Sequence, residues 1–298
     1  MTQKPHDTFA KQYLYGLLDP IGEEVEISRE VPPITQRQID LWFRPRPQAP
    51  ISRDEYGLLG RMLAHPCLIE PFRNPAPIKE IKGCLNKLLT IQADLERNAK
   101  KQKLKVNQAD QPWLWICVPT ASQRVLDGFG AVLKPGWGDG VFFLAEHLQS
   151  AIVVIHQLPQ MPDTLWLRLL GRDSVQRKAI AELLAMPQSW MQLHALEALA
   201  QLQILLKNRH NVNKDEQELI MQLSPVYQKW LEETRRDAKQ DAKQEELESM
   251  LQERYGAITP DLARIIPALL GRSALDRAQL ILKLTKEELV SRLSAETV

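Results

Sequence analysis

The chain has 298 residues, of which 44% are hydrophobic and 25% are charged, enough apolar material for a core in one large or two smaller domains. Its net charge of +1 gives no general attraction to nucleic acid or membranes, although local basic clusters could still provide one. Three cysteines without a CxxC pair argue against a disulfide framework or zinc site, and no apolar run approaches the about 20 residues of a transmembrane helix, so we expect a cytoplasmic protein without a membrane segment.

The first elements are predicted to be one helix and two strands. In residues 5–18 an apolar side chain recurs at every fourth position, which is typical of a helix with one buried face. Residues 23–31 alternate between polar and apolar side chains, as in a half-exposed strand. A second strand at 38–44 would place Asp40 and Trp42 on the face opposite its apolar odd-numbered residues, and the short connection predicts an antiparallel pair.

Residues 53–105 are predicted to be mostly helical, with prolines interrupting the segment after Pro66. The segment ends in a run of basic residues: Arg97, Lys100, Lys101, Lys103 and Lys105. One interpretation is a solvated helix end, where cations suit the negative end of the helix dipole. The alternative is a contact with nucleic acid, because the same cations would neutralise phosphates.

The stretch 113–159 predicts the strands of the main core. Its segments WLWICVP, VFFL and AIVVIHQLP are short apolar runs bounded by proline and glycine. Residues 120–129 fit a short helix between them. The loop PGWGDG lacks the Gly-Lys-Ser/Thr ending of a phosphate loop, so it is predicted to be a turn.

The second half of the chain is predicted to be helical. A helix at 163–186 is expected to break near Gly171, and a further helix follows at 190–208. Residues 215–223 predict a short helix, and Ser224-Pro225 has the composition of a new helix start.

A long helix at 225–255 carries the tandem repeat DAKQDAKQ, whose Asp and Lys residues are within ion-pairing reach on a polar surface. This helix is expected to bridge two modules or to pair weakly with a second copy as a coiled coil. The tail contains a capping box at Thr285–Glu288. We therefore predict an α/β domain at 1–210 with a helical insertion at about 53–105, a helical connector at 211–255 and a small helical module at 256–298.

Motifs with catalytic spacing are few. The six histidines have no spacing typical of metal ligands, and His156, at the end of an apolar segment, is predicted to be a core or rim residue. Cys117 lies in an apolar run and is expected to be a buried, inert thiol. No GxSxG, HExxH or Walker pattern occurs, and no small-molecule substrate is evident. Asp40 is the one suggestive carboxylate, because aspartate is depleted in strands; the alternative is an exposed polar face.

A family resemblance extends these predictions. The segments HDTFAKQYL, VEISREV and RQIDLWF resemble the opening of the Rpn-like, transposase-associated branch of the PD-(D/E)XK nuclease superfamily. Later segments such as LWICVPTAS and AIVVIHQLP look like a group of uncharacterised proteins near that family, some labelled flagellar assembly protein H. The resemblance implies an α/β fold with a restriction-endonuclease-like mixed sheet flanked by helices, here followed by an all-helical C-terminal half.

The resemblance also implies a site. Asp40 would ligate Mg²⁺, and the next strand would add a second carboxylate and a Lys or Gln for metal-assisted phosphodiester cleavage. We assign that strand to residues 113–119, which contain no Asp, Glu, Lys or Gln. The sequence thus offers Asp40 as the one metal ligand in the expected place.

Other charged residues near the predicted strands could compensate for the missing pair. They are Glu26 and Glu30 on the neighbouring strand, and Asp7 and Lys11 on the first helix. The candidate catalytic residues are therefore Asp40, Glu26, Glu30 and Lys11.

Two functions are compatible with these patterns. The first is a nuclease-like protein with a degenerate site and a binding or interaction role, favoured by the bare strand at 113–119 and the polar helix at 225–255. Its partners would be DNA or a second copy of the chain. The alternative is an active Mg²⁺-dependent DNA endonuclease, favoured by Asp40 and the basic run at 97–105.

Overall fold

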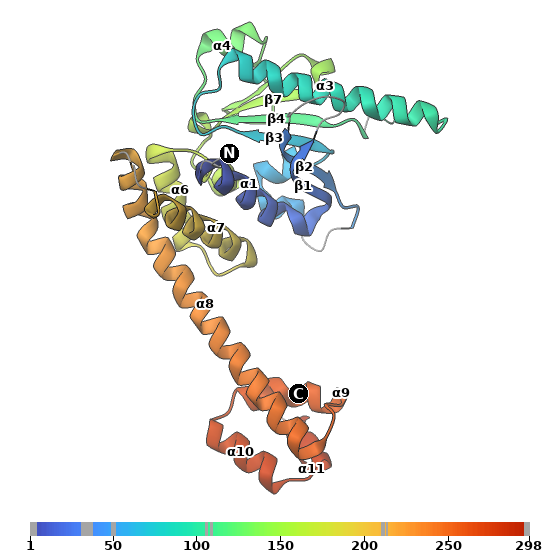
Figure 1. Cartoon of the computed structure of the whole chain (residues 1–298), viewed down its shortest axis with the longest axis vertical. Coiled ribbons are helices and arrows are strands. Elements are labelled where there is room, and N and C mark those ends of the chain that lie inside the picture. Colours follow the sequence, from blue (N-terminus) through green and yellow to red (C-terminus); the bar gives the residue numbers. More distant parts are fainter. Residues whose placement is uncertain are drawn as a thin grey trace. The chain divides into compact units, whose positions relative to one another are not determined.

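The structure of the protein is a computed structural model (Figure 1), which describes residues 5–30, 38–48, 52–104, 107, 110–209, 212 and 214–294. The chain forms two compact units, Met1–Gln228 and Lys229–Val298. The division between them falls inside one long helix, within the segment predicted to be a connector.

A mixed sheet forms the centre of the first unit and confirms the predicted α/β class. Over the described residues it has seven strands in the order β1-β2-β3-β4-β7-β6-β5. Strands β3, β4 and β7 are parallel, while the strands at both edges are antiparallel to their neighbours. The strands are β1 (Gly22–Glu30), β2 (Gln38–Pro45), β3 (Cys67–Pro71), β4 (Trp113–Val118), β5 (Val132–Leu133), β6 (Val141–Phe143) and β7 (Ser150–Val154).

Helices cover both faces of this sheet, and the described part of the chain after β7 is helical, as predicted for the C-terminal half. Their bounds are α1 (Pro5–Leu18), α2 (Leu58–Met62), α3 (Ile78–Lys101), α4 (Gln123–Gly128), α5 (Leu165–Arg168), α6 (Asp173–Ala185), α7 (Trp190–Lys207), α8 (Lys214–Tyr255), α9 (Pro260–Leu270), α10 (Ala274–Lys283) and α11 (Lys286–Ser294). Figure 1 shows α3 on one side of strands β3, β4 and β7 and α1 on the other.

Strand β4 contributes residues to both apolar cores of the first unit, one on each face of the sheet. Its residues alternate between the faces, and Leu114 and Ile116 pack with α3 while Trp115 and Cys117 pack with α1 and α7. Both faces are therefore buried, which is why the segment is an unbroken apolar run without the alternation of a half-exposed strand. Burial raises the pKa of the Cys117 thiol, in agreement with the predicted inert cysteine.

The prediction that residues 53–105 are mostly helical misses strand β3. This strand pairs antiparallel with β2 and parallel with β4, so it lies in the middle of the sheet. A five-residue apolar run has no periodicity that separates a strand from a buried helical turn. Its place between two partner strands decides its conformation, and α3 begins only at Ile78.

The predicted face pattern of β2 is also wrong in part. Leu41 and Phe43 pack on the α1 side as expected, but Ile39 packs with Trp42 on the α3 side. The alternation breaks beside Ser28 of β1, whose φ of 58° lies in the left-handed region. As a result, the Asp40 side chain points toward α1 and forms an ion pair with Lys11.

Helix α8 corrects a further prediction, since 215–223 and 225–255 belong to one helix that runs through Pro225. Proline at φ near −65° fits a helix at the cost of one hydrogen bond. Other boundaries are confirmed: the chain leaves helical structure at Gly171, between α5 and α6, and PGWGDG forms a turn. In that turn Gly140 has φ of 84°, and a Cβ there would lie 2.9 Å from Val154 O.

The second unit is a small helical module with its own core. Leu247 and Leu251 of α8 pack against apolar residues of α9, α10 and α11. The capping box is confirmed, with the Thr285 N–H donating to Glu288 Oε2 at 2.9 Å and the Glu288 N–H donating to Thr285 Oγ1 at 3.4 Å. Among the described helices of both units, none is long and apolar enough to cross a membrane.

Candidate functional site

Asp40 lies near the start of β2 and is bound by a lysine of α1. The Lys11 Nζ is 2.9 Å from Asp40 Oδ1 and 3.1 Å from Asp7 Oδ2. Burial opposes the charge of Lys11, but the hydrogen bonds and charges of Asp40 and Asp7 outweigh it and raise its pKa. The structure thus brings together the predicted Asp40 and Lys11, with Asp7 one helical turn away.

Glu70 supplies a second carboxylate that the sequence-based prediction missed. The register pairs Leu41 with Ile69, so one step further along the two antiparallel strands Asp40 lies opposite Glu70. Glu70 is only 1% exposed, and both of its oxygens accept hydrogen bonds from Lys87 Nζ at 2.8 Å. Burial and the neighbouring Asp40 raise the pKa of Glu70 to about 7, against the lowering effect of Lys87.

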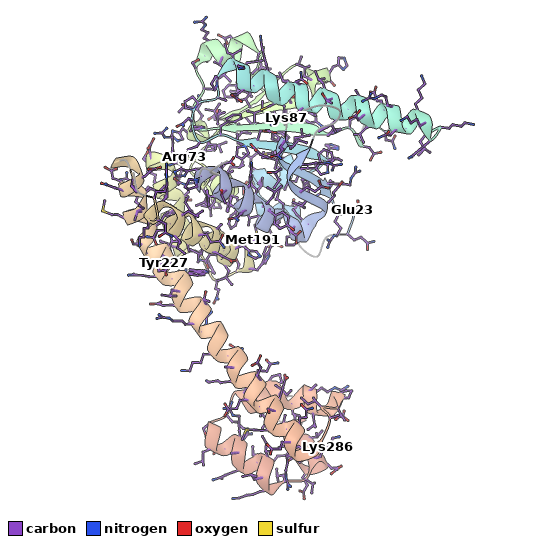
Figure 2. All side chains as sticks on the ribbon, viewed as in Figure 1. Glu23, Arg73, Lys87, Met191, Tyr227 and Lys286 are labelled. Atoms are coloured by element: carbon purple, nitrogen blue, oxygen red, sulfur yellow. The ribbon has the colours of Figure 1, made fainter. Side chains whose placement is uncertain are left out.

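Four elements converge on this group of charged residues. Helix α1 carries Lys11, β2 carries Asp40, β3 carries Glu70 and α3 carries Lys87 (Figure 2 labels Lys87). The two acids lie at one end of the sheet, and the two cations come from helices on its opposite faces. Two like charges this close need such partners, because an unpaired buried carboxylate costs several kcal/mol (~3–5 when a partner is removed).

The signal for Glu70 was present in the sequence. A glutamate directly follows the buried run Cys67–Ile69 and precedes the proline-rich segment FRNPAP, which marks the end of a strand. Once 67–71 is a strand, the next strand after Asp40 is β3 and not β4. The absence of charged residues in β4 therefore no longer indicates a missing pair, although Phe72 occupies the position two residues after Glu70 where the resemblance implies Lys or Gln.

The remaining predicted site residues lie elsewhere or are not described. Glu26 is 3.6 Å from Arg29 and is hydrogen bonded to Glu24, on the part of β1 paired with Trp42. Burial and the neighbouring Glu24 raise the pKa of Glu26. Glu30 pairs with Gln38 through the backbone, but its side chain lies outside the described part of the structure. No contact of Glu26 with Asp40 is formed among the described side chains.

A cleft of about 570 Å³ opens beside Asp40. The first turn of α1, the segment after β3 and residues near the end of α7 form its walls, and its polar lining includes His6, Arg73 and Arg209 (Figure 2 labels Arg73). The Arg73 Nη1 donates to Gly171 O at 2.7 Å and to Gln176 Oε1 at 3.1 Å, which fixes the guanidinium.

His6 reports the electrostatic environment of this cleft. Burial and the charges of Arg73, Arg209 and Arg172 lower its pKa to about 3, so the ring is neutral near pH 7. Its Nδ1 is buried and has no hydrogen-bond partner within the described residues. The wall near His6 therefore combines the charges of nearby arginines with a buried polar atom that has no hydrogen-bond partner among the described residues.

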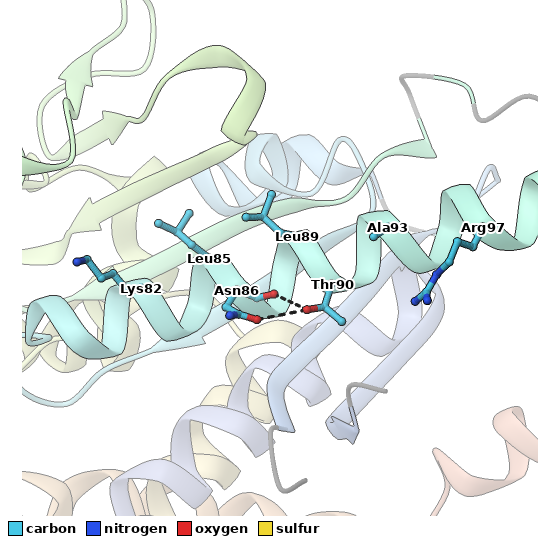
Figure 3. Close-up of a pocket in the computed structure, with 7 residues that line it drawn as sticks. All are labelled: Lys82, Leu85, Asn86, Leu89, Thr90, Ala93 and Arg97. Carbon is cyan, nitrogen blue, oxygen red and sulfur yellow. Dashed lines mark hydrogen bonds between the residues drawn. The ribbon is translucent and has the colours of Figure 1, made fainter. Parts of the chain in front are cut away.

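A larger hollow of about 630 Å³ lies along α3 but offers no such chemistry. Figure 3 shows its lining, all from this one helix, with the Thr90 hydroxyl donating to Asn86 O at 2.8 Å. The hollow is a widely open groove on the outer surface of the helix. The described residues of the basic run at its far end are mostly exposed, as in a solvated helix end, and Lys105 lies outside the described residues.

His156 takes a rim position, as predicted. The ring is half-buried, and its Nε2 accepts a hydrogen bond from the Arg172 N–H at 3.4 Å. Burial lowers the pKa of this histidine. Throughout the part of the chain that the structure describes, no group of three or more His, Cys, Asp or Glu side chains is arranged to hold a metal ion.

Comparisons with known proteins give no family for this chain. No protein-family model matches it, and neither the curated proteins nor the solved structures contain a match.

Proposed function

We propose that the first unit is a Mg²⁺-dependent nuclease of the PD-(D/E)XK type that cleaves phosphodiester bonds of DNA. The observation that carries the proposal is the pairing of Asp40 with Glu70 at one end of the sheet, each held by a lysine within 3 Å. The element order also fits the resemblance, apart from the short helix α2 between β2 and β3, since α1 is followed by three antiparallel strands, the helix α3 and the parallel strand β4.

The donor set suits Mg²⁺. This ion prefers oxygen ligands and commonly uses one or two carboxylates together with water and substrate phosphate, so two carboxylates are sufficient. Asp40 and Glu70 would hold it. When bound, Mg²⁺ supplies charge stabilisation at the phosphate and lowers the pKa of water.

The two lysines have distinct roles in this proposal. Lys87 would take the part of the Lys or Gln that the resemblance implies two residues after Glu70, because its Nζ lies 2.8 Å from both Glu70 oxygens and could donate to a phosphate oxygen bound beside them. Lys11 holds Asp40 in position and offsets its charge. Both cations would also offset the mutual repulsion of the two carboxylates before metal binds.

The test is nicking of supercoiled plasmid by the purified full chain with Mg²⁺ or Mn²⁺. We expect nicking by the native protein, none detectable in Asp40→Asn or Glu70→Gln, and about a 100-fold loss of rate in Lys87→Met. Asp139→Asn and Glu146→Gln change the same residue types at exposed positions outside the site and should retain the native rate. Thermal unfolding of each variant verifies its fold.

Native-like nicking by both Asp40→Asn and Glu70→Gln would contradict the proposal. The second candidate is a nuclease-like protein without catalysis that binds DNA or another protein, which Phe72 in place of the expected Lys or Gln favours. Absence of nicking in the folded native protein, together with retained DNA binding, would support this second candidate.

A further inference from the structure

The cleft beside Asp40 has three chemically different parts, and together they suggest the form of the substrate. One part is the carboxylate of Asp40 itself, where the proposed cleavage takes place. The second contains the first turn of α1 with the cations Arg73 and Arg209, beside the acids Asp7 and Glu216. The third is an apolar wall formed by the segment that follows β3.

The second part suits a phosphate group. Helix α1 has 14 residues, and its N-terminus carries the partial positive charge of the helix dipole. Arg73 is held in place by two hydrogen bonds, so little side-chain entropy is lost when it contacts a ligand. Two acids also line this part of the cleft: Asp7 is paired with Lys11, and Glu216 is paired with Arg209 and offsets part of its charge.

The apolar wall suits a base. Phe72 is half-buried and lines the cleft together with Pro71, the last residue of β3, and with Pro75 and Pro77, which follow that strand. An aromatic ring beside a phosphate site is the arrangement with which proteins stack an unpaired base. At this position the PD-(D/E)XK resemblance implies Lys or Gln, so the exchange for Phe replaces a polar contact with a stacking surface.

The size of the cleft limits what can enter. A volume of 570 Å³ corresponds to a cube roughly 8 Å on a side, within the usual range for one small ligand. The bases of a duplex are stacked and paired, so an enzyme that needs one base in a pocket must flip it out or act on an unpaired strand.

We propose that the cleft binds one nucleotide of a single-stranded nucleic acid, with the phosphate at Arg73 and the first turn of α1 and the base against Phe72. The inference deepens the proposed function and rests on it, since it names the substrate form of the same site. Duplex DNA would then be cleaved only where a strand is unpaired, as at a flap or bubble.

Binding is measured apart from cleavage. Fluorescein-labelled oligonucleotides of about 12 units, as oligo(dT), oligo(rU) and a DNA duplex of equal length, are titrated with the full chain by fluorescence anisotropy in EDTA and in Ca²⁺. We expect the single strand to bind at least about tenfold more tightly than the duplex. The oligo(rU) arm shows whether RNA shares the site with DNA.

Two matched pairs of variants locate the contact. Phe72→Leu should weaken single-strand binding about tenfold, whereas Phe129→Leu, which changes a phenylalanine of the same apolar cluster outside the cleft, should not. Arg209→Gln should weaken it several-fold more than Arg97→Gln, which removes an equal charge at the exposed far end of α3.

Equal or tighter binding of the duplex, or equal effects of Phe72→Leu and Phe129→Leu, would overturn the inference. Cleavage of perfect duplex at the rate of single strands would also overturn it while leaving the proposed nuclease function intact. Conversely, the native protein could prefer single strands, lose that preference in Phe72→Leu, and cleave no substrate. This result would support the single-strand binding inference and would contradict only the proposed nuclease activity.

Discussion

At the scale of single residues, the carboxyl group of Glu70 depends on its neighbours. Burial and Asp40 favour its neutral form, while Lys87 favours the charged form, and the balance places its pKa at about 7. Lys11 of α1 binds Asp40 of β2, and Lys87 of α3 binds Glu70 of β3. The two helices lie on opposite faces of the sheet, so these ion pairs connect both helices to the two strands. The geometry of the candidate site therefore depends on how α1 and α3 pack on the two faces of the sheet.

His6 gives a pH-dependent prediction at the same scale. Its pKa is lowered to about 3 by burial and by Arg73, Arg209 and Arg172, while the unfolded chain has the ordinary value of about 6.5. Between these values the unfolded state binds a proton that the folded state does not, so stability is intact above pH 6.5 and falls as pH decreases toward 3. At pH 5 the loss reaches at most about 2 kcal/mol.

Urea unfolding of the native protein and of His6→Gln between pH 7.5 and 5 measures this loss. The variant has no imidazole to protonate, so the native protein should lose stability relative to it as the pH falls. Parallel stability curves for the two proteins, or a His6 ring resonance that titrates near pH 6.5, would show that the imidazole is accessible to protons in the folded state.

At the scale of elements, the sequence predicts the helices and strands that have long periodic or apolar patterns. It misses a short element whose conformation is determined by pairing with neighbouring strands. Periodicity places α1, α7 and the long helices, and β4 follows from its apolar run. The strand β3 is too short to show a period, and only its pairing with β2 and β4 makes it a strand.

Because the sequence does not predict strand β3, it also does not predict all the residues of the candidate site. The sequence predicts Asp40 as a candidate because an aspartate within a strand is unusual, and it offers Lys11 as a charge that could compensate for the missing pair. Glu70 and Lys87 were not, because their roles depend on β3 lying beside β2 and on α3 packing over it. The break in alternation at Asp40 likewise lies beside the left-handed backbone of Ser28 in the neighbouring strand, which no sequence pattern marks.

Pro225 within α8 gives the prediction for this scale. Proline lacks the N–H that would donate to the carbonyl of Met221, and an interior helix proline costs about 3 kcal/mol. Pro225 is exposed, so Pro225→Ala restores this bond without disturbing the core and should raise stability by about 1–3 kcal/mol.

The measurement is urea unfolding followed by circular dichroism. Pro77→Ala serves as the control, because Pro77 is the N-cap of α3, where the missing N–H would have no helical acceptor. Its effect should stay within about 0.5 kcal/mol. A destabilised Pro225→Ala protein would mean that the proline favours a bend that the packing of α8 requires.

At the scale of the whole molecule, the two units have separate cores. The described side chains from Thr234 to Glu246 on α8 are exposed, so this stretch buries nothing between the apolar clusters that precede and follow it. The second cluster uses Leu247, Leu251 and residues of α9 to α11, all within the second unit. Cooperativity follows shared burial, so each unit should unfold as its own cooperative transition.

Core truncations in each unit test this independence. Leu251 in the second unit and Leu196 in the first are both fully buried, so replacing either by alanine should cost about 3 kcal/mol. We expect calorimetry of the full chain to show two transitions, with Leu251→Ala lowering only one and Leu196→Ala lowering only the other. A single transition that both variants shift equally would show that α8 transmits stability between the units although its middle has no core. In that case the exposed middle of α8, and not buried contacts, would couple the two units.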